Sequence, residues 1–133
     1  MTKEERIETA GMLKASGKAN CTQAVLKVFE EELKFDSEFL MKMSAGFAAG
    51  MGCMESTCGA LIGAVMVAGI FSDGIGTARY SKEIVKKFSE SCGATICKDL
   101  KGVETKKVLC ECPQCVKNAV KALYEVLGEK LPE

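Results

Sequence analysis

The sequence contains no histidine and no tryptophan. Without histidine, the chain has no imidazole general base, no Cys–His dyad and no Cys₂His₂ zinc site. It also has no excess of charge, because 18 Lys and Arg residues balance 18 Asp and Glu residues. This balance provides no electrostatic footprint for nucleic acid or for an anionic membrane surface. Any metal ion must therefore be held by thiolates, with carboxylates as the remaining donors.

The sequence also shows no signal-peptide pattern at its start and no long uninterrupted apolar run. Its start, MTKEERIETA, does not show the basic and then apolar pattern of a signal peptide. The most apolar stretch, residues 44–71, is divided by Glu55 and by the turn-like Gly50-Met51-Gly52, and its second part has 14 residues. A membrane-spanning helix needs about 20 residues. We therefore expect a cytoplasmic protein with no membrane span and no nucleic-acid partner.

Helical periodicity is the main structural pattern that the chain does contain. Tyr80, Ile84, Phe88 and Cys92 recur every four residues, with charged residues between them. No run alternates with period two, and 133 residues suit one domain. The sequence therefore predicts an all-α single domain, residues 1–133. We expect a bundle of about five to seven helices around a buried Gly- and Ala-rich helical hairpin in residues 44–71.

Capping residues predict where the helices begin. The second and third helices are expected to run over about residues 21–33 and 38–49, and a break is expected at the glycines of residues 50–52. Pro113 suits the first position of the last helix. The predicted N-caps are Thr2, Asn20, Asp36 or Ser37, Ser56 or Thr57, Thr77, Thr95 and Cys112.

Eight cysteines are an unusually large number for a cytosolic chain of this length. In that compartment, thiols usually bind metals or carry redox chemistry rather than form structural disulfides. Four of them are predicted to lie in the first turn of a helix, where the helix dipole and free N–H groups favour the thiolate. These are Cys21, Cys58, Cys97 and Cys115. If the four helix starts converge, they form a pocket for reactive sulfur, for an iron–sulfur cluster or for a small anion.

The remaining cysteines carry weaker signals. Cys53 and Cys92 are predicted at helix ends in apolar surroundings, and we interpret both as small core residues. The run Cys110-Glu111-Cys112-Pro113-Gln114-Cys115 contains a C-P-x-C element, but no βαβ pattern surrounds it, which argues against a thioredoxin fold. A second C-x-x-C and the ferredoxin-type cysteine run are both absent. A cluster or metal site must therefore be assembled from distant cysteines.

Several short motifs resemble one known family. They are Asn20-Cys21-Thr22-Gln23-Ala24, Cys58-Gly59-Ala60-Leu61-Ile62-Gly63, Cys97-x-x-Leu100 and Cys115. Together they resemble the redox-active C_GCAxxG_C_C family over nearly the whole chain. The resemblance implies four characteristic cysteines, a redox role and genes found beside transporter genes. Its cysteines correspond to Cys21, Cys58, Cys97 and Cys115, although Cys112 also fits the last position.

Three functional hypotheses follow. The first is an oxidoreductase acting by thiol–disulfide exchange or by electron transfer through an iron–sulfur cluster. In the dithiol form, Cys58 beside the unhindered Gly59 is the predicted attacking thiolate, and Cys21, Cys97 or Cys115 resolves the intermediate. In the cluster form, Gly59 borders the site, and its ligands are Cys21, Cys58, Cys97, and Cys112 or Cys115.

The second hypothesis is a non-catalytic module that holds zinc or copper with the same thiolates. The third is a structural helical protein linked to a transporter, with its cysteines in the core. The expected partners are a redox protein or a small thiol or metal ligand. The apolar hairpin also suggests a homodimer.

Overall fold

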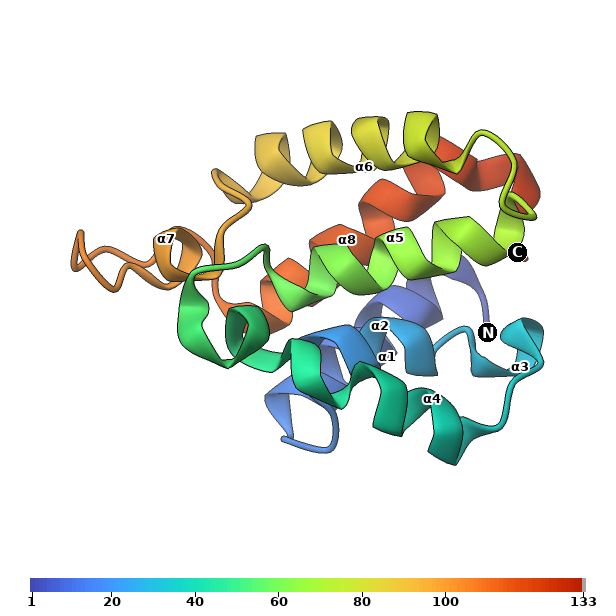
Figure 1. The fold of residues 1–133 in the computed structure, drawn as a ribbon, viewed down its shortest axis with the longest axis horizontal. Helices are drawn as coiled ribbons and strands as arrows, with labels where there is room; N and C mark the ends of the chain where they lie inside the picture. The colour runs from blue at the N-terminus through green and yellow to red at the C-terminus, as the bar shows by residue number, and fades with distance from the viewer. Residues whose placement is uncertain (133) are drawn as a thin grey trace.

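The computed structural model describes residues 1–132, and over that range the chain is all-α, with no β-strand (Figure 1). Short 3₁₀ turns at Ala45–Phe47 and Gly128–Lys130 and a π-type turn at Gly50–Met54 complete the described secondary structure. The eight helices of this range are α1 (Lys3–Ala15), α2 (Cys21–Lys27), α3 (Glu30–Leu33), α4 (Ser37–Ser44), α5 (Gly59–Phe71), α6 (Thr77–Cys92), α7 (Cys97–Lys101) and α8 (Cys112–Leu127).

Two helices, α5 and α8, form the centre of the core. Helix α8 packs against α1, α2, α5 and α6, and α5 packs against α2, α6 and α8. Helix α5 has small residues where α2 crosses it, and a Cβ added at Gly63 would lie 3.0 Å from the Thr22 carbonyl oxygen and from Val25 Cβ. Glycine is unfavourable inside a helix, but at this position it permits α2 and α5 to approach each other closely.

The predicted hairpin is buried mainly through its second arm. Helix α5 contributes buried residues along its length, whereas α4 buries only Leu40 and Ser44. The two arms are separated by a segment in which Ala49, Gly50 and Met51 all have positive φ angles. This segment reverses the chain direction where the sequence predicts a break.

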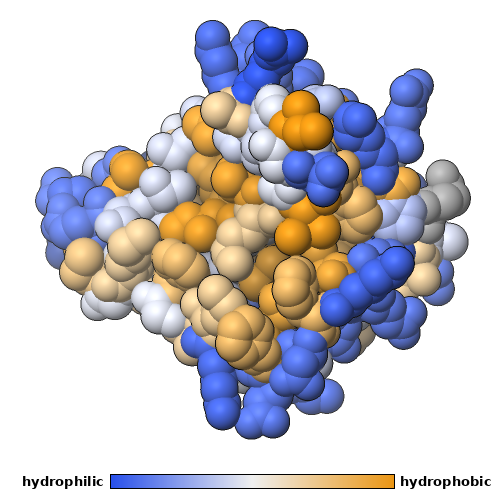
Figure 2. Space-filling model, turned by 45° about the vertical axis from the view of Figure 1, so that its right-hand side comes forward, coloured by the Kyte–Doolittle hydropathy of each residue, from blue (hydrophilic) through white to orange (hydrophobic). Residues whose placement is uncertain are grey.

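Hydrophobic side chains gather on one face of the molecule, with charged side chains around them (Figure 2). An apolar groove of about 170 Å³ involves α4 and α5, and Phe39, Met43 and Ile70 on its walls are largely exposed. The homodimer expected from the apolar stretch stays a prediction. No helix among the described residues is both long and apolar enough to cross a membrane.

Three predicted N-caps are confirmed. Thr2 and Asn20 each form a reciprocal capping box, with Glu5 and Gln23 respectively, and Asp36 accepts a hydrogen bond from the Phe39 N–H. The predicted caps at Ser56 or Thr57, Thr77, Thr95 and Cys112 are wrong by one or two positions, because the caps are Cys58, Gly76, Ile96 and Glu111.

Tertiary pairing explains two of these shifts. Thr57 and Ile96 form an isolated antiparallel bridge, in which the Cys58 N–H donates to the Thr95 carbonyl at 2.7 Å. The Cys97 N–H donates to the Ser56 carbonyl at 3.0 Å. Helices α5 and α7 therefore begin only after this pairing ends.

The second predicted helix is divided into α2 and α3. Phe29 has φ −116° and ψ 5°, which is outside helical geometry. Its neighbour Val28 directs its carbonyl to the buried guanidinium of Arg6, which donates a hydrogen bond to it. The third predicted helix also ends early, at Ser44. These interruptions explain why the described chain has more and shorter helices than the sequence predicts.

Candidate thiol site

The starts of several helices meet at one end of the molecule, on the left of Figure 1, where α5, α7 and α8 begin and α6 ends. A cavity of about 110 Å³ lies there. Lys14 and Lys101 border it, so its charged lining is positive. The cysteines that line it are Cys21, Cys58, Cys97, Cys110, Cys112 and Cys115.

The four motif cysteines lie at helix starts, although Cys58 is the N-cap of α5 and not, as predicted, in its first turn. Cys21 and Cys97 are the first residues of α2 and α7, Cys58 directly precedes α5, and Cys115 lies in the first turn of α8. The Thr57–Ile96 bridge joins the segments before α5 and α7. Local capping and one backbone pairing therefore bring together residues that lie far apart in the sequence.

Gly59 allows α2 and α5 to approach each other at the cavity. A Cβ at this position would lie 2.7 Å from Thr22 Oγ1 and 3.4 Å from Cys21 Cβ. The Thr22 hydroxyl occupies that space and donates a hydrogen bond of 2.8 Å to the Gly59 carbonyl. The glycine therefore brings the start of α2, and with it Cys21, against the start of α5.

Cys21 and Cys112 both line the cavity and shift each other's pKa, and we call them the outer pair. Cys112 is partly exposed, whereas Cys21 is buried. The Cys21 thiol stabilises the Cys112 thiolate by a hydrogen bond, which outweighs burial and lowers the pKa of Cys112 to about 6, with further help from Lys101 and Lys14. The same interaction, together with burial, raises the pKa of Cys21. The pair therefore combines an accessible sulfur that favours the thiolate with a buried thiol.

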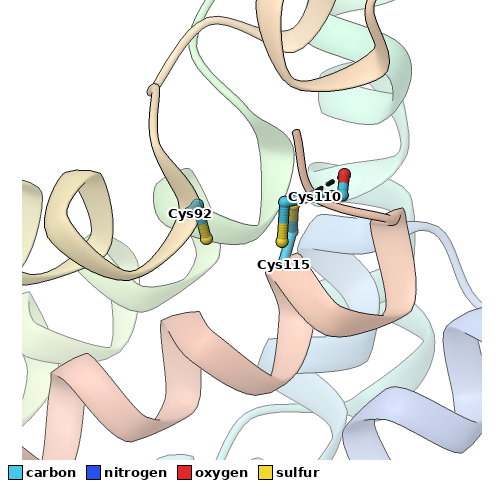
Figure 3. Close-up of side chains that lie close together, drawn as sticks. All are labelled: Cys92, Cys110 and Cys115. Atoms are coloured by element: carbon cyan, nitrogen blue, oxygen red, sulfur yellow. Dashed lines mark hydrogen bonds between the residues drawn. The ribbon is translucent and has the colours of Figure 1, made fainter. Parts of the chain in front are cut away.

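Cys92, Cys110 and Cys115 form a second group, which we call the inner group. Their three sulfurs lie within 4.8 Å of one another, all three residues are buried, and they are placed to hold a metal ion (Figure 3). The Cys115 thiol donates to the Cys110 carbonyl at 3.6 Å (Figure 3). Asn118 Nδ2 donates to Cys92 Sγ at 3.3 Å and lies 4.0 Å from Cys110 Sγ.

The pKa values of the three thiols in the inner group are shifted in different directions. The Cys115 thiol, followed by Asn118 and Cys110, stabilises the Cys92 thiolate and lowers the pKa of Cys92 to about 6, although burial opposes this. Burial raises the pKa of Cys110 to about 11. Hydrogen bonds to Cys58 and Cys92 raise the pKa of Cys115. Cys115 is therefore the thiol that stays protonated beside a sulfur that favours the thiolate.

Cys58 adjoins the inner group, and Cys97 stands apart from it. A hydrogen bond from Cys115 lowers the pKa of Cys58 against the effect of burial, and the backbone N–H groups of Ala60 and Leu61 add to the lowering. Burial raises the pKa of Cys97. Cys97 therefore lines the cavity as a thiol without a strong sulfur partner.

Sequence reasoning missed part of this arrangement. Cys92 is buried, as expected of a core residue, but its sulfur also belongs to the inner group. No role was predicted for Cys110, although it begins the C-x-C-x-x-C run that could have marked it. The expectation that Cys53 is a core residue is wrong, because Cys53 is exposed in the turn at Gly50–Met54.

No curated protein and no solved structure matches the chain. One family model does match, over residues 19–126, and it is described as "Putative redox-active protein (C_GCAxxG_C_C)". The matched range includes both the outer pair and the inner group. The family label writes its second cysteine after glycine, whereas this chain has Cys58 before Gly59. Because the model covers most of the chain, the protein belongs to the C_GCAxxG_C_C family.

Proposed function

We propose that the protein is a thiol–disulfide oxidoreductase whose outer pair, Cys21 and Cys112, cycles between dithiol and disulfide. The observation that carries the proposal is the position of this pair on the cysteine-lined cavity, with Cys112 partly exposed and Cys21 buried. A nucleophile that solvent can reach beside a protected resolving thiol is the arrangement that disulfide exchange requires.

The reaction consumes one substrate disulfide. The Cys112 thiolate attacks one substrate sulfur, forms a mixed disulfide and releases the first substrate thiolate, which takes up a proton. Cys21 then loses its proton and attacks Cys112 Sγ, which breaks the mixed disulfide and releases the second substrate thiolate. The substrate gains two electrons and two protons, and the protein is left with a Cys21–Cys112 disulfide.

Exposure decides which cysteine we assign as the attacking group. Cys58, the residue expected from the sequence, is 6% exposed, and its strongest sulfur partner is the buried Cys115. Cys112 is the more accessible cysteine. Lys14 and Lys101 at the cavity favour an anionic substrate. A small anionic disulfide, or an acidic segment of a redox partner protein, therefore fits the site.

The proposal is tested with glutathione disulfide and protein that has been fully reduced without oxygen. Wild-type protein is expected to lose two hydrogens and release two thiols. In Cys21→Ser the reaction should stop at one glutathione bound to Cys112, because no resolving thiol remains. Cys112→Ser should form neither product, and Cys53→Ser, which alters an exposed cysteine away from the cavity lining, should behave as wild type.

Peptide mapping of the trapped adduct decides between the two candidate nucleophiles. An adduct on Cys58, or wild-type turnover by Cys112→Ser, would refute the assignment. Iron and sulfide analysis of protein purified without oxygen tests the other form of redox activity. Stoichiometric iron with matching sulfide would indicate that the protein carries a cysteine-bound cluster and would contradict the thiol-exchange proposal.

A further inference from the structure

We propose that Cys58, Cys92, Cys110 and Cys115 together bind one zinc ion as a tetrathiolate site, separate from the outer pair. Cys92, Cys110 and Cys115 already bring three sulfurs within 4.8 Å of one another. We assign Cys58 as the fourth donor, because it lines the same cavity as Cys110 and Cys115 and lies at the start of α5. The inference does not rest on the redox function of Cys21 and Cys112.

The spacing of the sulfurs favours one ion rather than a cluster. Zinc–sulfur bonds of about 2.3 Å in a tetrahedron place neighbouring sulfurs about 3.8 Å apart. The three sulfurs of the inner group therefore need only a small contraction to surround one ion. In a [4Fe–4S] cluster each cysteine binds a separate iron, which spreads the sulfurs farther apart. Four thiolates and no histidine suit the soft-ligand preference of zinc.

An amide side chain also points at these sulfurs. Asn118 is only 8% exposed, and its Nδ2 donates to Cys92 Sγ at 3.3 Å. Its Oδ1 accepts a hydrogen bond of 2.9 Å from Gln114 Nε2, which orients the amide so that its donor faces the sulfurs. Metal-bound ligands usually have such outer-shell partners. A buried amide that donates to sulfur is therefore better explained by a thiolate site than by four neutral thiols.

The two longest helices that begin here supply positive polarity to the site. Cys58 caps α5, and the N–H groups of Ala60 and Leu61 stabilise its thiolate. Cys115 lies in the first turn of α8. Cys92 is the last residue of α6, where the helix dipole opposes negative charge, and this is the sulfur that receives the Asn118 hydrogen bond. Each thiolate at a helix end thus has a compensating interaction.

The cavity provides the route by which an ion enters. Cys58, Cys110 and Cys115 line it, so three of the four donors can be reached through it. Zinc binding would displace the remaining thiol protons to solvent and join the ends of α5, α6 and α8. The ion would then stabilise one part of the lining of the cavity that the outer pair also lines.

The experiment begins with metal-free, reduced full-length protein titrated with Co²⁺ and then with Zn²⁺. We expect one Co²⁺ per chain with the visible absorption of a tetrahedral cobalt–thiolate complex, and displacement of that ion by zinc. X-ray absorption of the zinc form should give four sulfur neighbours at about 2.3 Å. Cys92→Ser and Cys110→Ser should weaken binding more than Asn118→Ala, for which an outer-shell loss of about 10–100-fold is expected. Cys53→Ser and Cys112→Ser should bind as wild type does.

Several results would overturn the inference. They are the absence of stoichiometric cobalt or zinc binding in the reduced wild-type protein, a sulfur coordination number below four, and binding that survives Cys92→Ser and Cys110→Ser. Binding lost only in Cys21→Ser and Cys112→Ser would indicate that the ion binds at the outer pair instead. Iron accompanied by sulfide in protein purified without oxygen would also refute it. Because Asn118→Ala leaves every sulfur in place, it keeps the test valid if a cysteine variant does not fold.

Discussion

Buried polar groups lie at both ends of the helical core, but their interaction partners differ. At the end near α3, on the right of Figure 1, Arg6 is 2% exposed and donates to the Val28 carbonyl and to the Glu32 carboxylate. Its guanidinium also lies 4.9 Å from the centre of the Phe29 ring. At the other end, buried or partly buried cysteines surround a cavity and pair mainly with each other.

The difference follows from the chemistry of the two groups. A guanidinium is charged at any accessible pH, so a buried arginine needs permanent partners whenever the protein is folded. A thiol can lie buried as a neutral group and become charged only when a neighbour stabilises the thiolate. The Arg6 end is therefore expected to contribute stability, and the thiol end to contribute reactivity. Each of the following changes tests one side of this division.

Replacing Arg6 should have the largest effect on stability. Arg6→Ala leaves the Val28 carbonyl without its donor and removes the partner of Glu32. We expect a loss of about 3 kcal/mol, at the low end for breaking a buried ion pair, because Glu32 keeps some contact with water. Urea unfolding measures this loss. In the folded fraction, the reaction of Cys112 with disulfide should be unchanged, and a large change in its rate would show that the two ends are coupled.

Gly59→Ala should come next and should affect both stability and reactivity. The new methyl group would lie 2.7 Å from Thr22 Oγ1 and would force α2 away from α5. Such overpacking costs about 1–3 kcal/mol. Because Cys21 begins α2, the same shift should slow formation of the Cys21–Cys112 disulfide.

Gly69→Ala is the matched control in the same helix, because nothing lies within 4 Å of its added Cβ. It should leave the disulfide rate unchanged and raise stability by up to about 1 kcal/mol. Equal effects of the two substitutions would show that the contact at Gly59 has no special role. Thermal unfolding and the rate of disulfide formation together distinguish these outcomes.

The effect of Glu32→Gln should be smaller and should depend on pH. Burial opposes ionisation of Glu32, but the hydrogen bond and charge of Arg6 outweigh it and lower the pKa of this carboxyl group. A lowered pKa contributes stability above the unfolded value, about 4.3, and that stability is lost as pH falls through the folded value. Wild-type protein should therefore be more stable than the variant by about 1 kcal/mol at pH 7. The difference should shrink below about pH 4. A difference that does not vary with pH would contradict this account of Glu32.

Cys53→Ser should have the smallest effect. Its side chain is exposed, and it does not line the cavity. The free energy of unfolding should change by less than about 0.5 kcal/mol. The count of rapidly alkylated thiols should fall by one, and turnover should be unaffected. A marked loss of turnover would extend the reactive region to the turn at Gly50–Met54.

Local signals in the sequence predicted much of the fold. The N-caps Thr2, Asn20 and Asp36 mark helix starts through contacts within a few residues. Such contacts need no tertiary partner, and so they can be recognised in the sequence. The break at Val28–Phe29 and the exact starts of α5 and α7 could not be predicted in this way. They depend on Arg6 and on the Thr57–Ile96 bridge, which come from distant parts of the chain.

The sequence by itself determined the helical class, the thiol character of the available chemistry and the placement of the four motif cysteines at helix starts. Hydrophobic periodicity, the lack of histidine and short-range capping are all visible along the chain. Tertiary structure alone decided that Cys112 pairs with Cys21 and that Cys92 and Cys110 join Cys115. Cysteine side chains are short, so which sulfurs meet depends on ångström-scale positions of α2, α6 and α8 that only the packed core sets.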